Sequence, residues 1–150
     1  ETPLAMVQMQ RLILISKAFV KTISPEQRHV LYSTLQPLLE HKDRSLQKRA
    51  WQTIAGLANL DKPFVEQQWR TLLETYIKSN EKSAPGTAYY RLRVLYALFM
   101  FAPASELPIL FRTVVPSLVI AAKEGNARAR QLAVNTFTDL IQNRLIVDGA

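Results

Sequence analysis

The sequence has no cysteine, and it contains only 4 glycines and 2 histidines among its 150 residues. Without cysteine there can be no disulfide framework, no thiolate metal site and no cysteine nucleophile. The scarcity of glycine disfavours a strand-and-turn architecture, because β-proteins need frequent turn residues. Hydrophobic residues make up 48% of the chain, which is enough for a core, and helix-forming Leu, Ala, Gln, Arg and Lys are abundant. The composition predicts an all-α protein.

Sequence patterns typical of catalysis are also missing. The two histidines, His29 and His41, belong to no zinc-protease motif, and there is no nucleophile elbow and no glycine-rich phosphate loop. Carboxylates occur singly, without a pair spaced for acid–base chemistry. We therefore expect a protein that is not an enzyme and that uses no cofactor, no metal and no small-molecule substrate.

Long apolar runs are absent as well. The longest, residues 94–102, falls far short of the roughly 20 residues that a membrane-spanning helix requires, so we expect no membrane partner. The chain begins in what reads as a helix and stops soon after another. We expect it to be a piece of a longer protein.

The charge is unbalanced towards basic residues. Lys and Arg number 19 against 12 Asp and Glu, which gives a formal net charge of +7 at pH 7. Such a balance attracts nucleic acid or acidic protein surfaces, although it says nothing about the fold.

Caps, prolines and apolar spacing divide the chain into helices. Ser24 and Pro25, followed by Gln27 at the capping-box position, form the clearest helix start. Pro37 and Pro116 each lie inside a helical pattern, where a proline bends the helix or ends it. The predicted helices cover about residues 4–23, 25–41, 45–60, 63–79, 87–102, 105–123 and 127–144. Residues 79–86 form the one long polar loop between them.

One helical pattern occurs three times. The stretch at 45–60, with a basic start, a small residue and then apolar positions, recurs at 90–101 and at 129–140. The equivalent positions Ala50 and Val94 are 44 residues apart, and Val94 and Ala133 are 39 apart. Periods of about 40 to 47 residues with two helices each are typical of HEAT and armadillo arrays. We therefore predict an α-solenoid of HEAT type, with about three and a half repeats and a right-handed superhelix.

Basic residues near the starts of the three repeat helices are the best candidate site. Equivalent positions line up in a stacked array, so these residues would form a stripe suited to phosphates. The alternative is that each one caps a helix or bridges neighbouring repeats through an acidic residue. The candidate nucleic-acid-binding residues are Lys48, Arg49, Arg91, Arg93, Arg128 and Arg130.

Four aromatic residues can likewise be interpreted as binding residues or as packing residues. Trp51, Trp69, Tyr89 and Tyr90 could stack on exposed bases. At helical spacing in an all-α chain, an aromatic side chain more often packs in the core or between repeats. Both interpretations stay open on the sequence alone.

Three stretches of the sequence carry a resemblance to a known family. They are SLQKRAW at 45–51, RLRVLYALF at 91–99 and VVPSLVIAAKEGNARARQLAVNTFTDLI at 114–141, of which residues 123–130 are the most telling. They resemble the later HEAT repeats of the ribosomal RNA-processing protein 12 family, which are large nucleolar solenoids of the pre-40S pathway. The resemblance covers roughly residues 35 to 145.

The resemblance implies a scaffold in ribosome biogenesis. Such a scaffold associates with precursor rRNA, pre-40S particles and assembly or export factors, in the nucleus and nucleolus with possible shuttling to the cytoplasm. It supplies no binding motif that transfers residue by residue. The alternative is a protein-only adaptor of the karyopherin-like or coat-type class, which would bind peptides or a small GTPase, and the basic stripe distinguishes the two.

Overall fold

A computed structural model describes residues 24–79, 82–123 and 126–145, and these ranges contain helices and no strand. The all-α class predicted from composition is therefore confirmed for the described part. The predicted helix at 4–23 lies outside the described residues. The α-helices are α2 (Pro25–Leu35), α3 (Arg44–Leu60), α4 (Lys62–Ser79), α5 (Ala88–Phe101), α6 (Leu107–Ala122) and α7 (Ala127–Leu140). Short 3-10 segments lie at Gln36–Glu40, Pro85–Thr87 and Ala104–Glu106, and a π-helical segment, Ile141–Leu145, follows α7.

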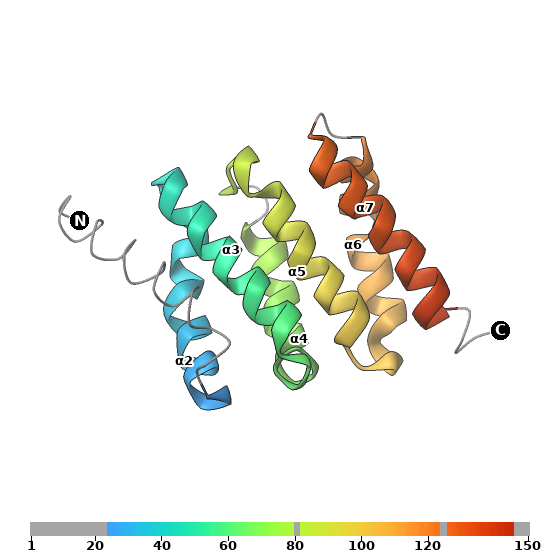
Figure 1. Cartoon of the computed structure of the whole chain (residues 1–150), viewed down its shortest axis with the longest axis horizontal. Coiled ribbons are helices and arrows are strands. Elements are labelled where there is room, and N and C mark those ends of the chain that lie inside the picture. The colour runs from blue at the N-terminus through green and yellow to red at the C-terminus, as the bar shows by residue number, and fades with distance from the viewer. Residues whose placement is uncertain (1–23, 80–81, 124–125, 146–150) are drawn as a thin grey trace.

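The helices are arranged in two layers (Figure 1). Helices α3, α5 and α7 lie side by side, α3 against α5 and α5 against α7, and we call them the front layer. Helices α2, α4 and α6 lie behind them and form the back layer, each packed on at least one front helix. The three front helices run in the same direction, so all three begin at the upper edge of Figure 1.

Helix α5 is at the centre of this packing. It contacts both front neighbours and also α4 and α6. A helix with neighbours on several sides needs apolar residues around most of its circumference, and the sequence of α5 provides them. Its buried residues are Leu92, Val94, Leu95, Ala97, Leu98 and Phe99. They join one hydrophobic cluster that extends through both layers.

The two prolines inside helical patterns have different effects. The predicted helix at 25–41 changes type next to Pro37, where a bend or a stop was expected: α2 ends at Leu35, and the chain continues as the 3-10 segment that contains Pro37. A proline has no N–H for the α-helical ladder, which explains the change of helix type. Pro116, in contrast, lies inside α6, which continues to Ala122. Buried Val114 and Leu118 on either side of Pro116 hold that helix against the front layer.

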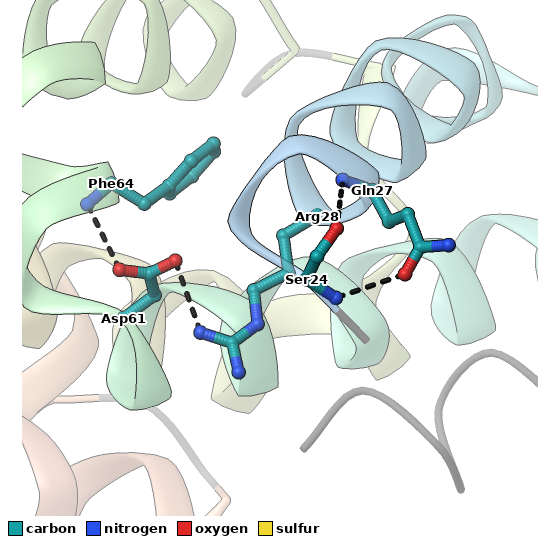
Figure 2. A network of polar contacts seen from close by, with 5 residues as sticks. All are labelled: Ser24, Gln27, Arg28, Asp61 and Phe64. Atoms are coloured by element: carbon teal, nitrogen blue, oxygen red, sulfur yellow. Dashed lines mark hydrogen bonds and ion pairs between the residues drawn. The ribbon is translucent and has the colours of Figure 1, made fainter. Parts of the chain in front are cut away.

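Side-chain caps and one ion pair fix the start of the back layer (Figure 2). The predicted capping box is present: the Ser24 hydroxyl accepts from the Gln27 backbone N–H at 3.2 Å, and the Gln27 side chain accepts from the Ser24 N–H at 2.9 Å. Asp61, in the turn between α3 and α4, accepts from the Phe64 N–H at 3.1 Å and from Arg28 at 3.2 Å. The Arg28 and Asp61 side chains are only 16% and 8% exposed. This pair ties α2 to the beginning of α4.

Helix α6 with its preceding turn is unusually apolar. Among the described residues, the segment Ala104–Ala122 is the one that is long and apolar enough to cross a membrane, judged by length and composition only. An 18-residue window within these 19 residues has a mean hydropathy of 1.4, and 28% of that window is buried. In the structure α6 packs against α5 and α7, and its other side exposes Ile109 and Ile120.

Candidate nucleic-acid interface

The first turns of the front helices meet at one edge of the molecule, which we call the basic edge (Figure 1). Asp43 caps α3 by accepting from the Leu46 N–H at 2.9 Å. Asn126 caps α7 by accepting from the backbone N–H groups of Arg128 and Ala129, at 2.9 and 3.1 Å. Parallel helix N-termini place the positive ends of their dipoles at the same edge, where they favour anions.

The structure places all six predicted site residues in the first two turns of the front helices. Lys48 and Arg49 are on α3, Arg91 and Arg93 on α5, and Arg128 and Arg130 on α7. Lys48, Arg128 and Arg130 are exposed, whereas Arg49, Arg91 and Arg93 are half-buried. Lys48, Arg49, Arg91, Arg128 and Arg130 therefore lie toward the starts of the front helices. The backbone of Arg93 lies against Asn59, in the last turn of α3, and so further from the basic edge.

The half-buried arginines of α5 also take part in the structure. The Arg91 guanidinium donates to the Thr87 hydroxyl at 3.0 Å. The backbone carbonyl of Arg93 accepts from the Asn59 side chain of α3 at 3.0 Å, which ties two front helices together. Arg91 therefore combines a charge near the basic edge with a structural hydrogen bond, whereas Arg93 is tied to α3 through its backbone.

Charge is distributed unevenly between the layers. The front helices contain seven Lys or Arg residues and a single acidic residue, Asp139, in the last turn of α7. The helices of the back layer contain five basic and three acidic residues. Asp139 lies at the opposite end from the basic edge, whereas Asp43, the N-cap of α3, and Glu40, the partner of Lys82, lie near it. Among the described residues near that edge the basic residues outnumber the acidic ones, which favours a positive potential there.

An open groove of about 540 Å³ extends the basic edge beside the start of α3. Its lining includes Lys42, Arg44 and Lys82, none of which was predicted as a site residue. Lys82 also forms an ion pair with Glu40 at 3.3 Å. Lys42 lies just before the first repeat helix and Arg44 is its first residue, so their positions in the sequence could have indicated both. Lys82 comes from the polar loop before α5, which the sequence singles out as a segment that could contact a partner, but its place beside the start of α3 was not indicated.

Buried Gln47 holds that loop over α3. Its side-chain amide donates to the Lys82 carbonyl at 3.1 Å and accepts from the Ala84 N–H at 2.8 Å. Gln47 is only 2% exposed. The groove wall is therefore fixed by hydrogen bonds from a front helix.

The four aromatic candidates divide into two pairs. Trp51 and Trp69 are 1% and 8% exposed, so both are core residues and neither can stack on a base. Tyr89 and Tyr90 are half-buried in the first turn of α5, at the basic edge. The Arg128 guanidinium carbon lies over the Tyr89 ring, 3.7 Å from its centroid, and so connects α7 to α5. In this contact Arg128 has an aromatic ring as its partner and not a carboxylate.

Titratable groups elsewhere do not form a second centre. In the ranges that the structure describes, no three His, Asp or Glu residues lie close enough to hold a metal ion. Tyr96 of α5 donates to Asp139 of α7 at 2.9 Å. Burial, followed by the hydrogen bond and the charge of Asp139, raises the pKa of Tyr96 above its usual value of 10.0. This contact joins two front helices away from the basic edge.

Comparison with known proteins gives one partial similarity. The chain is 27% identical over 116 residues to RRP12-like protein from Gallus gallus. The match covers 75% of this chain but 9% of that protein, so the chain corresponds to a small part of the relative. No family model matches the chain, and no solved structure matches it. The similarity supports the resemblance to the ribosomal RNA-processing protein 12 family in part.

Proposed function

We propose that this chain is a non-catalytic segment of a HEAT-type α-solenoid that binds precursor rRNA in pre-40S particles through its basic edge. In this proposal the protein acts in the nucleolus and nucleus as a scaffold, and other parts of its surface contact assembly or export factors. The observation that carries the proposal is the concentration of basic residues on the front helices, at the end where those helices begin.

The two-layer packing supports the solenoid. Each back helix is followed in the chain by a front helix, which gives the hairpins α2–α3, α4–α5 and α6–α7. The equivalent small or apolar positions Ala50, Val94 and Ala133 are all at most 1% exposed, as expected of residues that stack one hairpin on the next. The right-handed superhelix and the count of about three and a half repeats belong to this proposal.

The distribution of charge supports RNA over a purely protein partner. A protein that neutralises several phosphates releases the counterions condensed on the nucleic acid, which makes binding favourable and strongly dependent on salt. Adjacent packed helices have axes about 8 to 10 Å apart, so three parallel helices present basic residues at intervals along a row. Such a row suits a phosphate backbone that crosses the helix starts. The resemblance to the ribosomal RNA-processing family, which the similarity to RRP12-like protein supports in part, implies the same class of ligand.

Titration of an RNA at rising salt tests the proposal. We expect the logarithm of the binding constant for a pre-rRNA transcript to fall linearly with the logarithm of salt concentration. Changing Arg91, Arg93, Arg128 and Arg130 to Glu should flatten this slope by about 3 to 4, or roughly one for each phosphate that is no longer neutralised. Because Arg91 and Arg93 are half-buried, a second variant with Gln at these two positions separates the effect of charge from the effect of packing. Absent or salt-insensitive RNA binding would contradict the proposal and favour the protein-only adaptor.

A further inference from the structure

We propose that Arg128 and Tyr89 form a stacking platform for one unpaired base, so that the basic edge selects single-stranded over duplex RNA. This inference rests on the proposed function, because it requires RNA to reach the basic edge. It goes further by naming the form of the RNA and the two residues that recognise it.

The geometry of the pair is that of a stacked guanidinium. The Arg128 guanidinium carbon is 3.7 Å from the centroid of the Tyr89 ring, which is contact distance. Tyr89 is half-buried in the first turn of α5, whereas Arg128 is exposed in the first turn of α7. The guanidinium therefore lies over the ring, and the exposure of Arg128 leaves it accessible to a ligand.

Neighbouring contacts hold the platform in place. The Tyr89 ring meets the Tyr90 ring edge-on, with centroids 5.4 Å apart and an interplanar angle of 77°. The backbone N–H of Arg128 donates to the Asn126 side chain at 2.9 Å, which fixes the position from which its side chain extends. A side chain that is already ordered loses less entropy when a ligand binds.

The chemistry of the exposed guanidinium matches a nucleobase. Guanidinium planes and aromatic rings are the surfaces on which proteins stack unpaired bases, and an ammonium group lacks such a plane. Arg91 on α5 and Arg130 on α7 lie in the same helix turns and supply charge for the phosphates on either side. In a duplex the base faces are covered by neighbouring bases, so this platform acts only on a single strand.

Charge-conserving substitutions separate stacking from simple attraction. The variant Arg128→Lys keeps the positive charge and removes the plane, and Arg112→Lys, at an exposed position of the back-layer helix α6, is the matched control that should leave binding of all three probes unchanged. The probes are an adenine-rich single-stranded RNA, an abasic oligomer of the same length and charge, and a duplex RNA. We expect Arg128→Lys to weaken binding of the adenine-rich strand about tenfold, within the range for one stacked base. Binding of the abasic oligomer and of the duplex should change by less than about twofold.

Substitutions of the ring provide the second arm of the experiment. Tyr89→Leu should weaken binding of the adenine-rich strand as Arg128→Lys does, whereas Tyr89→Phe should bind it like the unmodified protein, because it keeps the ring. Thermal unfolding of each variant establishes that it is folded. Unchanged binding in Arg128→Lys, or an equal loss for all three probes, would overturn the platform while leaving RNA binding at the edge intact. If the unmodified protein bound none of the probes, the proposed function itself would fail.

Discussion

The two layers of helices are built from segments of similar length, yet they differ in charge. In the back layer, cations have acidic neighbours: Lys62 pairs with Glu66 at 3.7 Å, and Arg70 pairs with Glu106, just before α6, at 3.8 Å. In the front layer, the helices carry one acidic residue, Asp139, at the end far from the basic edge. Neighbouring charges of opposite sign largely cancel in the electrostatic field at a distance, whereas charges of one sign add to each other. The comparison is the reason that we propose the front layer, and not the surface as a whole, as the place where an anionic partner would bind.

The layers also differ in how they pack. Front helices contact one another directly, and α5 contacts helices of both layers. Fully buried alanines at their interfaces, such as Ala50 on α3 and Ala133 on α7, allow a close approach. In the back layer, α6 exposes Ile109 and Ile120 at 50% and 62%. We therefore expect truncation in the front layer to destabilise the fold more than the same change on the outside of the back layer.

Truncation of Leu95 tests this difference and has the largest expected effect on stability. Leu95 of α5 is fully buried, so Leu95→Ala should lower the free energy of unfolding by about 4 kcal/mol through lost burial and the cavity left behind. Ile109→Ala, in the back layer, should cost less than about 1 kcal/mol, because that side chain is half exposed. Urea unfolding followed by circular dichroism measures both values. Equal losses would show that α5 is not the centre of the packing.

Removal of the Asp61 carboxylate tests the polar tie of the back layer. Asp61→Ala should cost about 3 kcal/mol, because it removes the cap of α4 and leaves the mostly buried Arg28 charge without this carboxylate. Glu66→Ala breaks the exposed ion pair with Lys62 and should cost at most about 0.5 kcal/mol. The same urea titration compares them. If Asp61→Ala were as mild as Glu66→Ala, the contacts in Figure 2 would not hold α2 to α4.

The smallest expected effect concerns alkaline pH and the front layer. The folded structure raises the pKa of Tyr96, so the folded state holds this proton more tightly than the unfolded state does. The resulting stability is fully present below the unfolded pKa of about 10 and is lost as pH rises through the folded pKa. Tyr96→Phe should therefore reduce the decline in stability above pH 10, as measured by unfolding at several pH values. Some decline should remain, because burial also raises the pKa of Tyr32. An unchanged decline would show that the Tyr96 hydroxyl does not couple α5 to α7.

Local features of the fold were predictable because they depend on neighbouring residues. The capping box at Ser24 and the cap at Asn126 follow from short-range backbone chemistry, and both are present. The change of helix type at Pro37 follows equally from the missing N–H, although the uninterrupted course of α6 through Pro116 does not. The packing around Val114 and Leu118 decides the second case, and packing is not readable from one segment.

The parts of the fold and of the candidate site that escaped prediction depend on contacts between distant segments. Arg28 and Asp61 are 33 residues apart, and Gln47 meets the loop at Lys82 across 35 residues. The ring partner of Arg128 could not be predicted either, because it depends on which faces of α5 and α7 meet. The spacing of the basic residues placed them at helix starts, but only the parallel course of the front helices brings those starts to one edge.

The most direct test of the central claim compares equal changes of charge in the two layers. One variant changes Lys48, Arg128 and Arg130 to Glu, and the other changes Lys62, Arg70 and Lys78 to Glu; all six residues are exposed. Binding of a pre-rRNA transcript is measured for both as a function of salt. We predict that the front-layer variant loses at least tenfold in affinity and about 2 to 3 in salt slope, while the back-layer variant stays within about threefold of the unmodified protein. Equal weakening by both variants, or no weakening by the first, would contradict the assignment of RNA binding to the basic edge.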